Sequence, residues 1–476
     1  GSVPKDFSGP LALRFSCGTE ALFWAQTNNI WTPHQGLDVN RDAVHLTGDL
    51  APAPGSKVEY FIEAACNHPF GVSVFEWDGI DTWHRWNSEE PGRFERADVC
   101  TFDAQAWELR TAYQFVLQLM NELPHTSPRG QQIHAALRHA GVLLCERSRE
   151  GRVGEALQLL RGAIHVPAGG SATRCTAVGH AHIDTAWLWP LRETRRKCLR
   201  TFSNVLRLME REPQFVFLCS QAQQYAYIEQ DSPELFAEIA ARVREGRWEP
   251  GGGMWIEPDA NLVSGESLIR QILHGTSYWS QNFGDAAPQS FLFLPDTFGF
   301  PASLPQIMAK SGLSTFITNK LWWNQVNPFP HTTWRWRGID GSEVLAHNTP
   351  GGDYNATNTP RELRKGESQH QNKDLLPQAP TTPDPGTGSV EAARTARWLQ
   401  PFGFGDGGGG PTDWTIRFAQ HAANSDGLPR VTLGRADTFC AQLHSDQAAL
   451  RANAQDFPLW WGELYLEYHR GTFTTQ

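Results

Sequence analysis

The chain has 476 residues, of which 40% are hydrophobic and 43 are glycine, a composition that allows a sizeable core and excludes wholesale disorder. At roughly 150 residues per domain, this length predicts about three domains, or two of which one is large. The net charge is −10 and no long basic block stands out, so nucleic acid is not expected as a partner.

The cysteine and hydropathy patterns favour a soluble protein of a reducing compartment. The eight cysteines are scattered and form no C-x-x-C pair, which disfavours cysteine-ligated zinc and thioredoxin-type chemistry. No apolar run reaches the roughly 18 residues of a membrane span, and no signal-peptide pattern is present. We therefore expect a cytoplasmic protein without a membrane partner, and the sequence is compatible with an oligomer.

The first hundred residues show a β-like pattern. Short apolar runs at 11–15, 21–24 and 58–62 are separated by clusters of Gly, Pro and Asn, as strands and turns are. This pattern predicts a small β domain over residues 1–100.

Residues 101–170 change to helical spacing. Apolar residues recur from Leu109 to Met120 and again from Ile133 to Leu144, with Asp103 as an N-cap and Pro124 as a stop for the first helix. The pattern predicts a helical hairpin that links the β domain to the rest of the chain.

From residue 171 to 476 short strand-like runs alternate with helical ones, which is typical of βα units. Helices are expected over 191–211 and from Pro233 to about Gly246, after Ser232 as N-cap. Strands are expected at 176–178, 215–218, 290–294 and 315–317. The fold class is therefore α/β, with an irregular parallel β/α barrel-like catalytic domain over 171–476. A segment at about 365–395, rich in Pro, Thr, Gln and Gly, is expected to be a mobile loop.

Polar or small residues follow each of these strands directly. Because the carboxyl ends of parallel strands build the active sites of α/β folds, the chemistry is expected there. His182 and Asp184 follow the first strand, and residues i and i+2 of extended backbone point the same way. A nitrogen with a carboxylate suits a zinc-like ion, but a hydrogen-bonded loop pair is also compatible, and His180 is a rival ligand or supporting residue.

Two further carboxylates stand at unusual positions. Asp296 ends the most apolar strand of the chain, so it is either paired or coordinated, or it caps a following helix. Asp406 lies within Gly405–Thr412, whose glycines allow a close approach of backbone to a ligand. It either forms a turn or presents its carboxylate to a substrate. The segment lacks the Lys-Ser/Thr of a phosphate loop, so nucleotide binding fits poorly.

Aromatic residues are the last compositional signal. Many of the 19 Trp, Trp187 among them, stand beside polar residues and glycines rather than inside apolar runs. An aromatic face can carry the C–H-rich side of a sugar while its rim stays wet. Core packing explains most such residues, and the cluster as a whole favours a carbohydrate cleft only weakly.

Several motifs in order resemble glycoside hydrolase family 38, the class II α-mannosidases. They span nearly the whole chain after residue 172: Gly179-His-Ala-His-Ile-Asp-Thr-Ala-Trp-Leu-Trp-Pro190, Gly246-Arg-Trp-Glu-Pro250, Gly253-Met-Trp-Ile-Glu-Pro-Asp259, Phe293-Leu-Pro-Asp-Thr-Phe-Gly299, Asp340-Gly-Ser342, Gly405-Asp-Gly-Gly-Gly-Gly-Pro411 and Glu463-Leu-Tyr-Leu-Glu-Tyr-His-Arg-Gly-Thr472. The first 170 residues also resemble the cytosolic-type branch, at Glu63-Ala-Ala-Cys-Asn67 and Ser127-Pro-Arg-Gly130. Any one motif is weak, and their order makes the resemblance specific.

The resemblance implies one zinc ion, with another divalent ion such as cobalt as an alternative. The implied metal ligands are His182, Asp184, Asp296 and His469. Asp296 is also implied as the nucleophile and Asp406 as the acid/base. The implied sugar contacts are Trp187, which would stack on the ring, and Glu257 and Asp259, which would meet hydroxyls.

The expected activity is that of a retaining α-mannosidase, which hydrolyses α-D-mannosides of an oligosaccharide or glycan through a covalent glycosyl-Asp intermediate. Such an enzyme needs two carboxyl groups about 5–5.5 Å apart. Family members usually continue into further domains, so the chain is expected to lack the C-terminal ones. The alternatives are an inactive carbohydrate-binding fragment of such an enzyme, or a zinc-dependent deacetylase or amidohydrolase in which the metal activates water.

Overall fold

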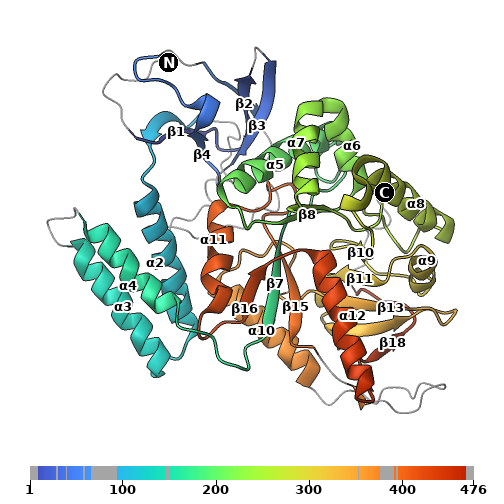
Figure 1. Cartoon of the computed structure of the whole chain (residues 1–476). Coiled ribbons are helices and arrows are strands. Elements are labelled where there is room, and N and C mark those ends of the chain that lie inside the picture. The colour runs from blue at the N-terminus through green and yellow to red at the C-terminus, as the bar shows by residue number, and fades with distance from the viewer. Residues whose placement is uncertain are drawn as a thin grey trace.

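The computed structural model describes residues 9–27, 30–38, 40–56, 59–65, 94–145, 151–351, 353–375, 391–392 and 395–467 (Figure 1). Its N-terminal part consists of two small antiparallel sheets. One has the order β4-β1-β6 and the other β3-β2-β5; the strands are β1 Leu11–Ser16, β2 Glu20–Thr27, β3 Ile30–Leu37, β4 Ala43–Leu46, β5 Phe61–Ala65 and β6 Arg96–Thr101. Alternate residues such as Leu13, Phe23 and Val44 point into a common core, as the period of two requires.

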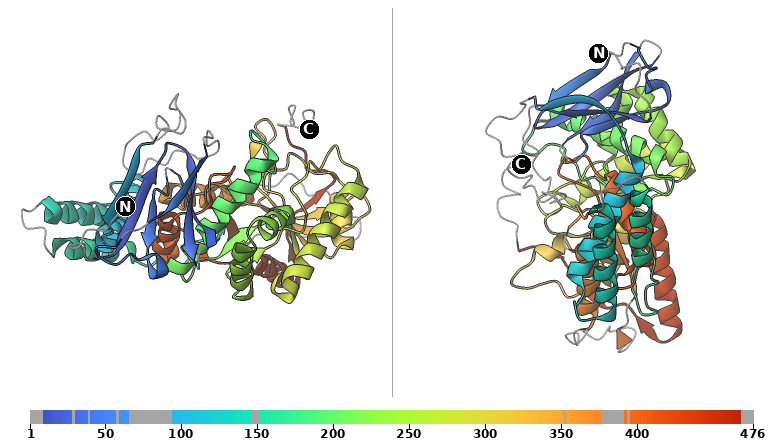
Figure 2. Two further views of the ribbon diagram at one scale, coloured as in Figure 1. Left: turned by 90° about the horizontal axis from the view of Figure 1, so that it is seen from above. Right: turned by 90° about the vertical axis from the view of Figure 1, so that its left-hand side faces the viewer.

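Three helices follow, α2 Ala104–Glu122, α3 Pro128–Cys145 and α4 Arg152–Ile164. Asp103 caps α2 as predicted, since its side chain accepts a hydrogen bond from the amide of Ala106 at 3.0 Å. The predicted hairpin had two helices, so α4 was missed. The buried residues of α4 nevertheless fall at helical spacing: Ala156, Leu157, Leu160 and Ile164. These helices lie along one side of the molecule (Figures 1 and 2).

The rest of the chain is mixed α/β, which confirms the predicted class. An all-parallel sheet has the order β15-β7-β8-β9, with β16 also paired to β7, and contains β7 Arg174–His180, β8 Phe217–Cys219, β9 Trp248–Pro250, β15 Arg397–Phe402 and β16 Arg430–Leu433. A second sheet has the order β10-β11-β13-β12-β18, from β10 Phe291–Phe293, β11 Thr315–Thr318, β12 Thr333–Arg337, β13 Glu343–Asn348 and β18 Leu459–Trp461. The pairings recorded among the described strands do not close the two sheets into a ring.

Helices surround these sheets: α5 Leu191–Arg211, α6 Ala222–Asp231, α7 Pro233–Arg244, α8 Gly265–Phe283, α9 Leu304–Lys310, α10 Pro360–Leu375, α11 Asp413–His421 and α12 Ala436–Ala452. The ends of α5 are those predicted from its apolar stripe. Helix α10 extends to residue 375, so the predicted start of the mobile loop at residue 365 is wrong. A two-strand ladder joins β14 Glu391–Ala392 to β17 Gln455–Asp456. Among the described residues, no helix combines the length and the apolar character needed to cross a bilayer.

Helix α5 lies between the N-terminal sheets and the parallel sheet (Figure 1). The approach of β3 to α5 is close, because a Cβ added at Gly36 would lie 2.7 Å from the carbonyl oxygen of Arg200. The carboxyl ends of β7, β10 and β15 lead into the segments that carry His182, Asp296 and Asp406. Strands of both sheets therefore lead to one polar centre.

Candidate active site

His182 is the centre of this polar cluster and is almost completely buried. It follows β7, and its Nε2 atom lies 3.5 Å from Oδ1 of Asp184 and 3.4 Å from Oδ2 of Asp296. The predicted convergence of His182 and Asp184 therefore occurs, and a carboxylate from a distant strand joins them. Although burial acts to lower it, the carboxylates of Asp184 and Asp296 hold the pKa of His182 well above its usual value.

Asp296 follows β10 and does not cap a helix, because the next helix begins at Leu304. The N-cap alternative is therefore wrong. One oxygen of Asp296 forms an ion pair with Nζ of Lys320, which follows β11 and has a side chain that is 1% exposed. Burial alone would raise the pKa of Asp296, but His182 and Lys320 lower it to about 2. The carboxylate is thus ionised at neutral pH.

Lys320 is held in place by aromatic rings as well as by Asp296. Its ammonium lies 3.5 Å from the ring centroid of Trp323 and 4.4 Å from that of Phe298. Such contacts stabilise a buried cation. Sequence reasoning assigned Lys320 no role, although its place just after a strand was a signal.

Asp406 comes from the glycine-rich loop after β15. The hydroxyl of Tyr354 donates a hydrogen bond of 2.8 Å to its Oδ1 atom. Side-chain atoms of His182, Asp296 and Asp406 that could each ligate a metal lie within 4.8 Å of one another. Asp406 therefore presents its carboxylate to the centre, and the loop closes a turn around it.

The backbone at Asp406 is unusual. Its φ of 51° lies in the left-handed region, which non-glycine residues seldom adopt. The neighbouring Gly405 has no room for a side chain, because an added Cβ would lie 2.1 Å from Oδ1 of Asn355 and 3.1 Å from Cβ of His182. Burial, joined by the negative charge of Asp296, raises the pKa of Asp406 to about 6 against the opposing effect of His182.

Glu257 lies behind His182 and Asp296 rather than at an open surface. Its Oε1 atom accepts hydrogen bonds from the amide of Asp296 at 2.6 Å and from the hydroxyl of Thr297 at 3.2 Å. Its Oε2 atom lies 3.4 Å from Nδ1 of His182. Burial raises the pKa of Glu257 to about 7, although the charge of His182 opposes this. The predicted contact with a sugar hydroxyl does not follow from this placement.

The other predicted residues that the structure describes make contacts of their own. Trp187 is 49% exposed and packs edge-on against Trp189. Asp259 closes a turn by accepting hydrogen bonds from the amides of Asn261 and Leu262, at 2.7 and 2.8 Å. His180 packs against Phe293, and burial lowers its pKa to about 3, helped by the charge of His182. His469 lies outside the described residues, so its role stays a prediction.

The donor set of this centre fits a divalent cation. Two buried atoms that face this centre, Nε2 of His182 and Oδ2 of Asp184, have no hydrogen-bond partner. Leaving such atoms unsatisfied costs free energy, which a bound ion would recover. One imidazole nitrogen with carboxylate oxygens is a set that suits zinc-like ions.

Comparison with known proteins relates the sequence of this chain to a family. The sequence model "Glycosyl hydrolases family 38 N-terminal domain" matches residues 172–463. The chain is 35% identical over 478 residues to "Alpha-mannosidase 2C1" of Homo sapiens, which covers 100% of this chain and 42% of that protein. It is 37% identical over 310 residues to "Alpha-mannosidase" of Saccharomyces cerevisiae, covering 64% of this chain and 26% of that protein.

Among solved structures, an alpha-mannosidase from Enterococcus faecalis V583 aligns with a TM-score of 0.47 at 20% identity. That alignment covers 61% of this chain and 31% of the other. The chain spans well under half the length of the curated relatives from human and yeast, 42% and 26%.

Proposed function

Because the chain belongs to glycosyl hydrolase family 38, we propose that it hydrolyses α-D-mannosides with retention of the anomeric configuration. Asp296 acts as the nucleophile and Asp406 as the acid/base. The observation that carries this proposal is the approach of these two carboxylates to within 4.8 Å around His182. Retaining glycosidases place their two carboxyl groups about 5–5.5 Å apart, whereas inverting ones need about 6.5–9.5 Å.

The charge states of the two carboxyl groups support these roles. Asp296, with its pKa lowered to about 2, is ionised and ready to attack the anomeric carbon. Asp406, with its pKa raised to about 6, holds a proton in part of the population near neutral pH. It donates that proton to the leaving oxygen, and then removes one from the water that hydrolyses the glycosyl-Asp296 ester. Unequal environments for two nearby carboxyl groups are how acid and base roles are divided.

We propose that His182, Asp184 and Asp296 hold one zinc ion, or another divalent ion such as cobalt, with His469 as the further predicted ligand. When bound, such an ion would supply Lewis-acid chemistry that orients the sugar hydroxyls and favours a distorted ring. Glu257 orients His182 from behind, and Lys320 neutralises part of the charge of Asp296. Each of these side chains thus has a proposed role at the reacting centre.

We further propose that Trp187 stacks on the sugar of an oligosaccharide or glycan substrate, which its exposed ring supports. A reducing, cytoplasmic environment is proposed because the described cysteines occur as free thiols, five of them buried. The division into a β domain, a helical domain and a catalytic domain stays a prediction in its boundaries.

The test is the release of an aryl group from an α-mannoside by the purified protein, before and after removal of metal by a chelator. We expect the activity to disappear with the chelator, to return with zinc and to be lost in Asp296→Asn. The first sugar product, observed by proton NMR, should be the α-anomer. Sugar binding without turnover by the zinc-loaded protein would contradict the proposal and favour the carbohydrate-binding alternative. A β-anomer as first product would overturn the retaining mechanism.

A further inference from the structure

The loop that carries Asp406 is an improbable piece of backbone. Positive φ angles occur at Asp406, Gly407, Gly409 and Gly410, namely 51°, 79°, 84° and 77°. Inside the loop, the amide of Gly408 bonds to the carbonyl of Gly405 at 2.8 Å, and Phe404 and Gly410 pair through their backbones. Glycine-rich chain loses much conformational freedom when it is fixed, so the loop needs contacts from outside to hold one shape.

These contacts come from Arg41, which lies 370 residues away in the N-terminal part of the chain. Its guanidinium donates to the carbonyl oxygens of Gly408 at 3.0 Å and of Pro411 at 3.0 Å, and also to that of Gly410. The side chain of Arg41 is 6% exposed, and it forms an ion pair with the equally buried Asp38. A planar guanidinium with five donors is suited to fixing several carbonyls at once.

The fit between Arg41 and the loop is tight. A Cβ added at Gly409 would lie 2.7 Å from Nη1 of Arg41 and 3.2 Å from Oδ2 of Asp38. Residues 38 and 41 pair through their backbones, at 3.2 and 3.1 Å, so the guanidinium is presented from a fixed turn beyond β3. The glycine at 409 is therefore required by the contact with Arg41 as well as by its own dihedral angle.

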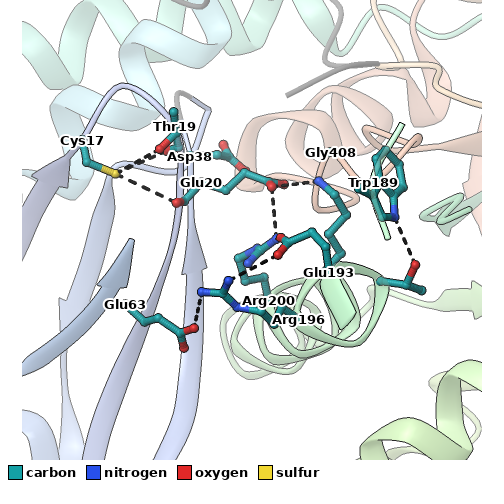
Figure 3. A network of polar contacts seen from close by, with 12 residues as sticks. Cys17, Thr19, Glu20, Asp38, Glu63, Trp189, Glu193, Arg196, Arg200 and Gly408 are labelled. Carbon is teal, nitrogen blue, oxygen red and sulfur yellow. Dashed lines mark hydrogen bonds and ion pairs between the residues drawn. The ribbon is translucent and has the colours of Figure 1, made fainter. Parts of the chain in front are cut away.

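Ion pairs join the N-terminal sheet that presents Arg41 to helix α5, and those made by Glu20 are buried (Figure 3). Glu20 of β2 accepts from Nζ of Lys197 at 2.8 Å and from Arg200 at 3.1 Å. Glu63 of β5 pairs with Arg196 in the same helix. Lys197 also supports the loop directly, because a Cβ added at Gly407 would lie 2.6 Å from its Cδ atom.

We propose that Arg41 is a positioning residue for the reaction: it fixes the loop so that the carboxyl group of Asp406 meets the leaving oxygen. The N-terminal sheet thereby completes the active site from outside the two sheets that carry His182, Asp296 and Asp406. This inference rests on the proposed function, in which Asp406 is the acid/base. Its distinctive consequence is that loss of Arg41 impairs proton donation while the nucleophile Asp296 stays in place.

The experiment compares two α-mannosides that differ in their need for acid catalysis. A 2,4-dinitrophenyl group leaves without a proton, whereas a methyl or phenyl group needs one. General acid catalysis contributes about 10²–10⁴-fold to a rate. Asp406→Asn should therefore slow the glycosylation step by roughly that factor with the methyl or phenyl mannoside, and far less with the 2,4-dinitrophenyl mannoside. Arg41→Met should show the same selective loss, by at least about tenfold.

Arg41→Lys keeps the charge but not the fork of donors, and should fall between wild type and Arg41→Met. Arg14→Met is the matched control, because it removes an arginine of the same N-terminal part that pairs with Asp42 at the surface. It should leave both rates unchanged. Equal losses on the two substrates in the folded Arg41 variants, or no loss at all, would overturn the inference. If Asp406→Asn itself shows no leaving-group selectivity, the acid/base assignment fails instead, and the role of Arg41 fails with it.

Discussion

The carboxylate of Glu257 faces Nδ1 of His182 at 3.4 Å, while Nε2 of the same ring faces Asp184 and Asp296 at 3.5 and 3.4 Å. In its ionised form Glu257 can only accept a hydrogen bond, so it favours the tautomer of His182 that carries its proton on Nδ1 and leaves Nε2 free for a metal. The residue therefore acts on the centre through His182.

Replacing Glu257 by Gln tests this arrangement. The new amide group would donate to Nδ1 and favour the opposite tautomer, so the affinity for zinc should fall by about 10–100-fold. The measurement is competition for zinc against a chromogenic chelator, with circular dichroism to show that the fold is kept. Glu266→Gln, at an exposed helix position, is the control. Unchanged zinc affinity in Glu257→Gln would remove Glu257 from the metal centre.

Lys320→Met should destabilise the protein and slow the reaction together. The change leaves the carboxylate of Asp296, which is 20% exposed, without its cation, and the cost should not exceed the about 3–5 kcal/mol that is typical when a fully buried pair loses one partner. Because Lys320 lowers the pKa of Asp296, its removal should also raise that pKa and move the acidic limb of the kcat/KM profile to higher pH. Chemical denaturation and a pH–rate profile measure the two effects. Lys320→Arg should retain most of the stability, and an unshifted acidic limb in Lys320→Met would contradict the role of the ion pair.

Gly405→Ala should abolish most activity without unfolding the protein. The added methyl group would lie 2.1 Å from Oδ1 of Asn355, which at present accepts a hydrogen bond of 2.7 Å from the amide of Gly405. The loop must shift and carry Asp406 with it, and a displacement of about 1 Å costs about 10²-fold in rate. Gly162→Ala is the control, because nothing lies within 4 Å of the added atom. Wild-type rates in Gly405→Ala would show that the loop tolerates displacement.

Acid should destabilise the protein partly through His421, which packs against Phe115 at 5.3 Å. Burial, helped by the charge of Arg417, lowers its pKa to about 3. In the unfolded chain the pKa of this histidine is about 6.5. Above that pH His421 is neutral in both states, and the folded protein keeps its full stability. As the pH falls below it, up to about 1.4 kcal/mol is lost per pH unit.

His421→Phe should reduce this loss, because the variant has no proton to bind in the unfolded state. Denaturant unfolding at pH 7, 6 and 5 gives the slopes of stability against pH for both proteins. His125→Phe, at an exposed site, should keep the wild-type slope. Parallel slopes for wild type and His421→Phe would mean that other groups cause the acid sensitivity.

The sequence by itself determined the α/β class, the family resemblance and the main chemistry-bearing residues. His182, Asp184 and Asp296 were found because polar side chains that follow apolar strands are expected at the active-site edge of an α/β fold, and Asp406 was found because it lies in a glycine-rich segment. Local periodicity also gave the ends of α5 and the cap of α2, since both depend on neighbours in sequence. The prediction missed α4, although its buried residues fall at helical spacing, and it missed the helical start of the predicted loop, where few apolar residues mark a buried face.

Only the tertiary structure decided what surrounds those residues. Lys320 and Tyr354 meet Asp296 and Asp406 from separate strands and loops, and Glu257 turns inward rather than toward a substrate. The largest separation is that between Arg41 and the loop it holds, 370 residues along the chain. The direction of a side chain and its contacts depend on how elements that are distant in the chain pack together. Local sequence patterns do not specify that packing, which is set by the fold as a whole.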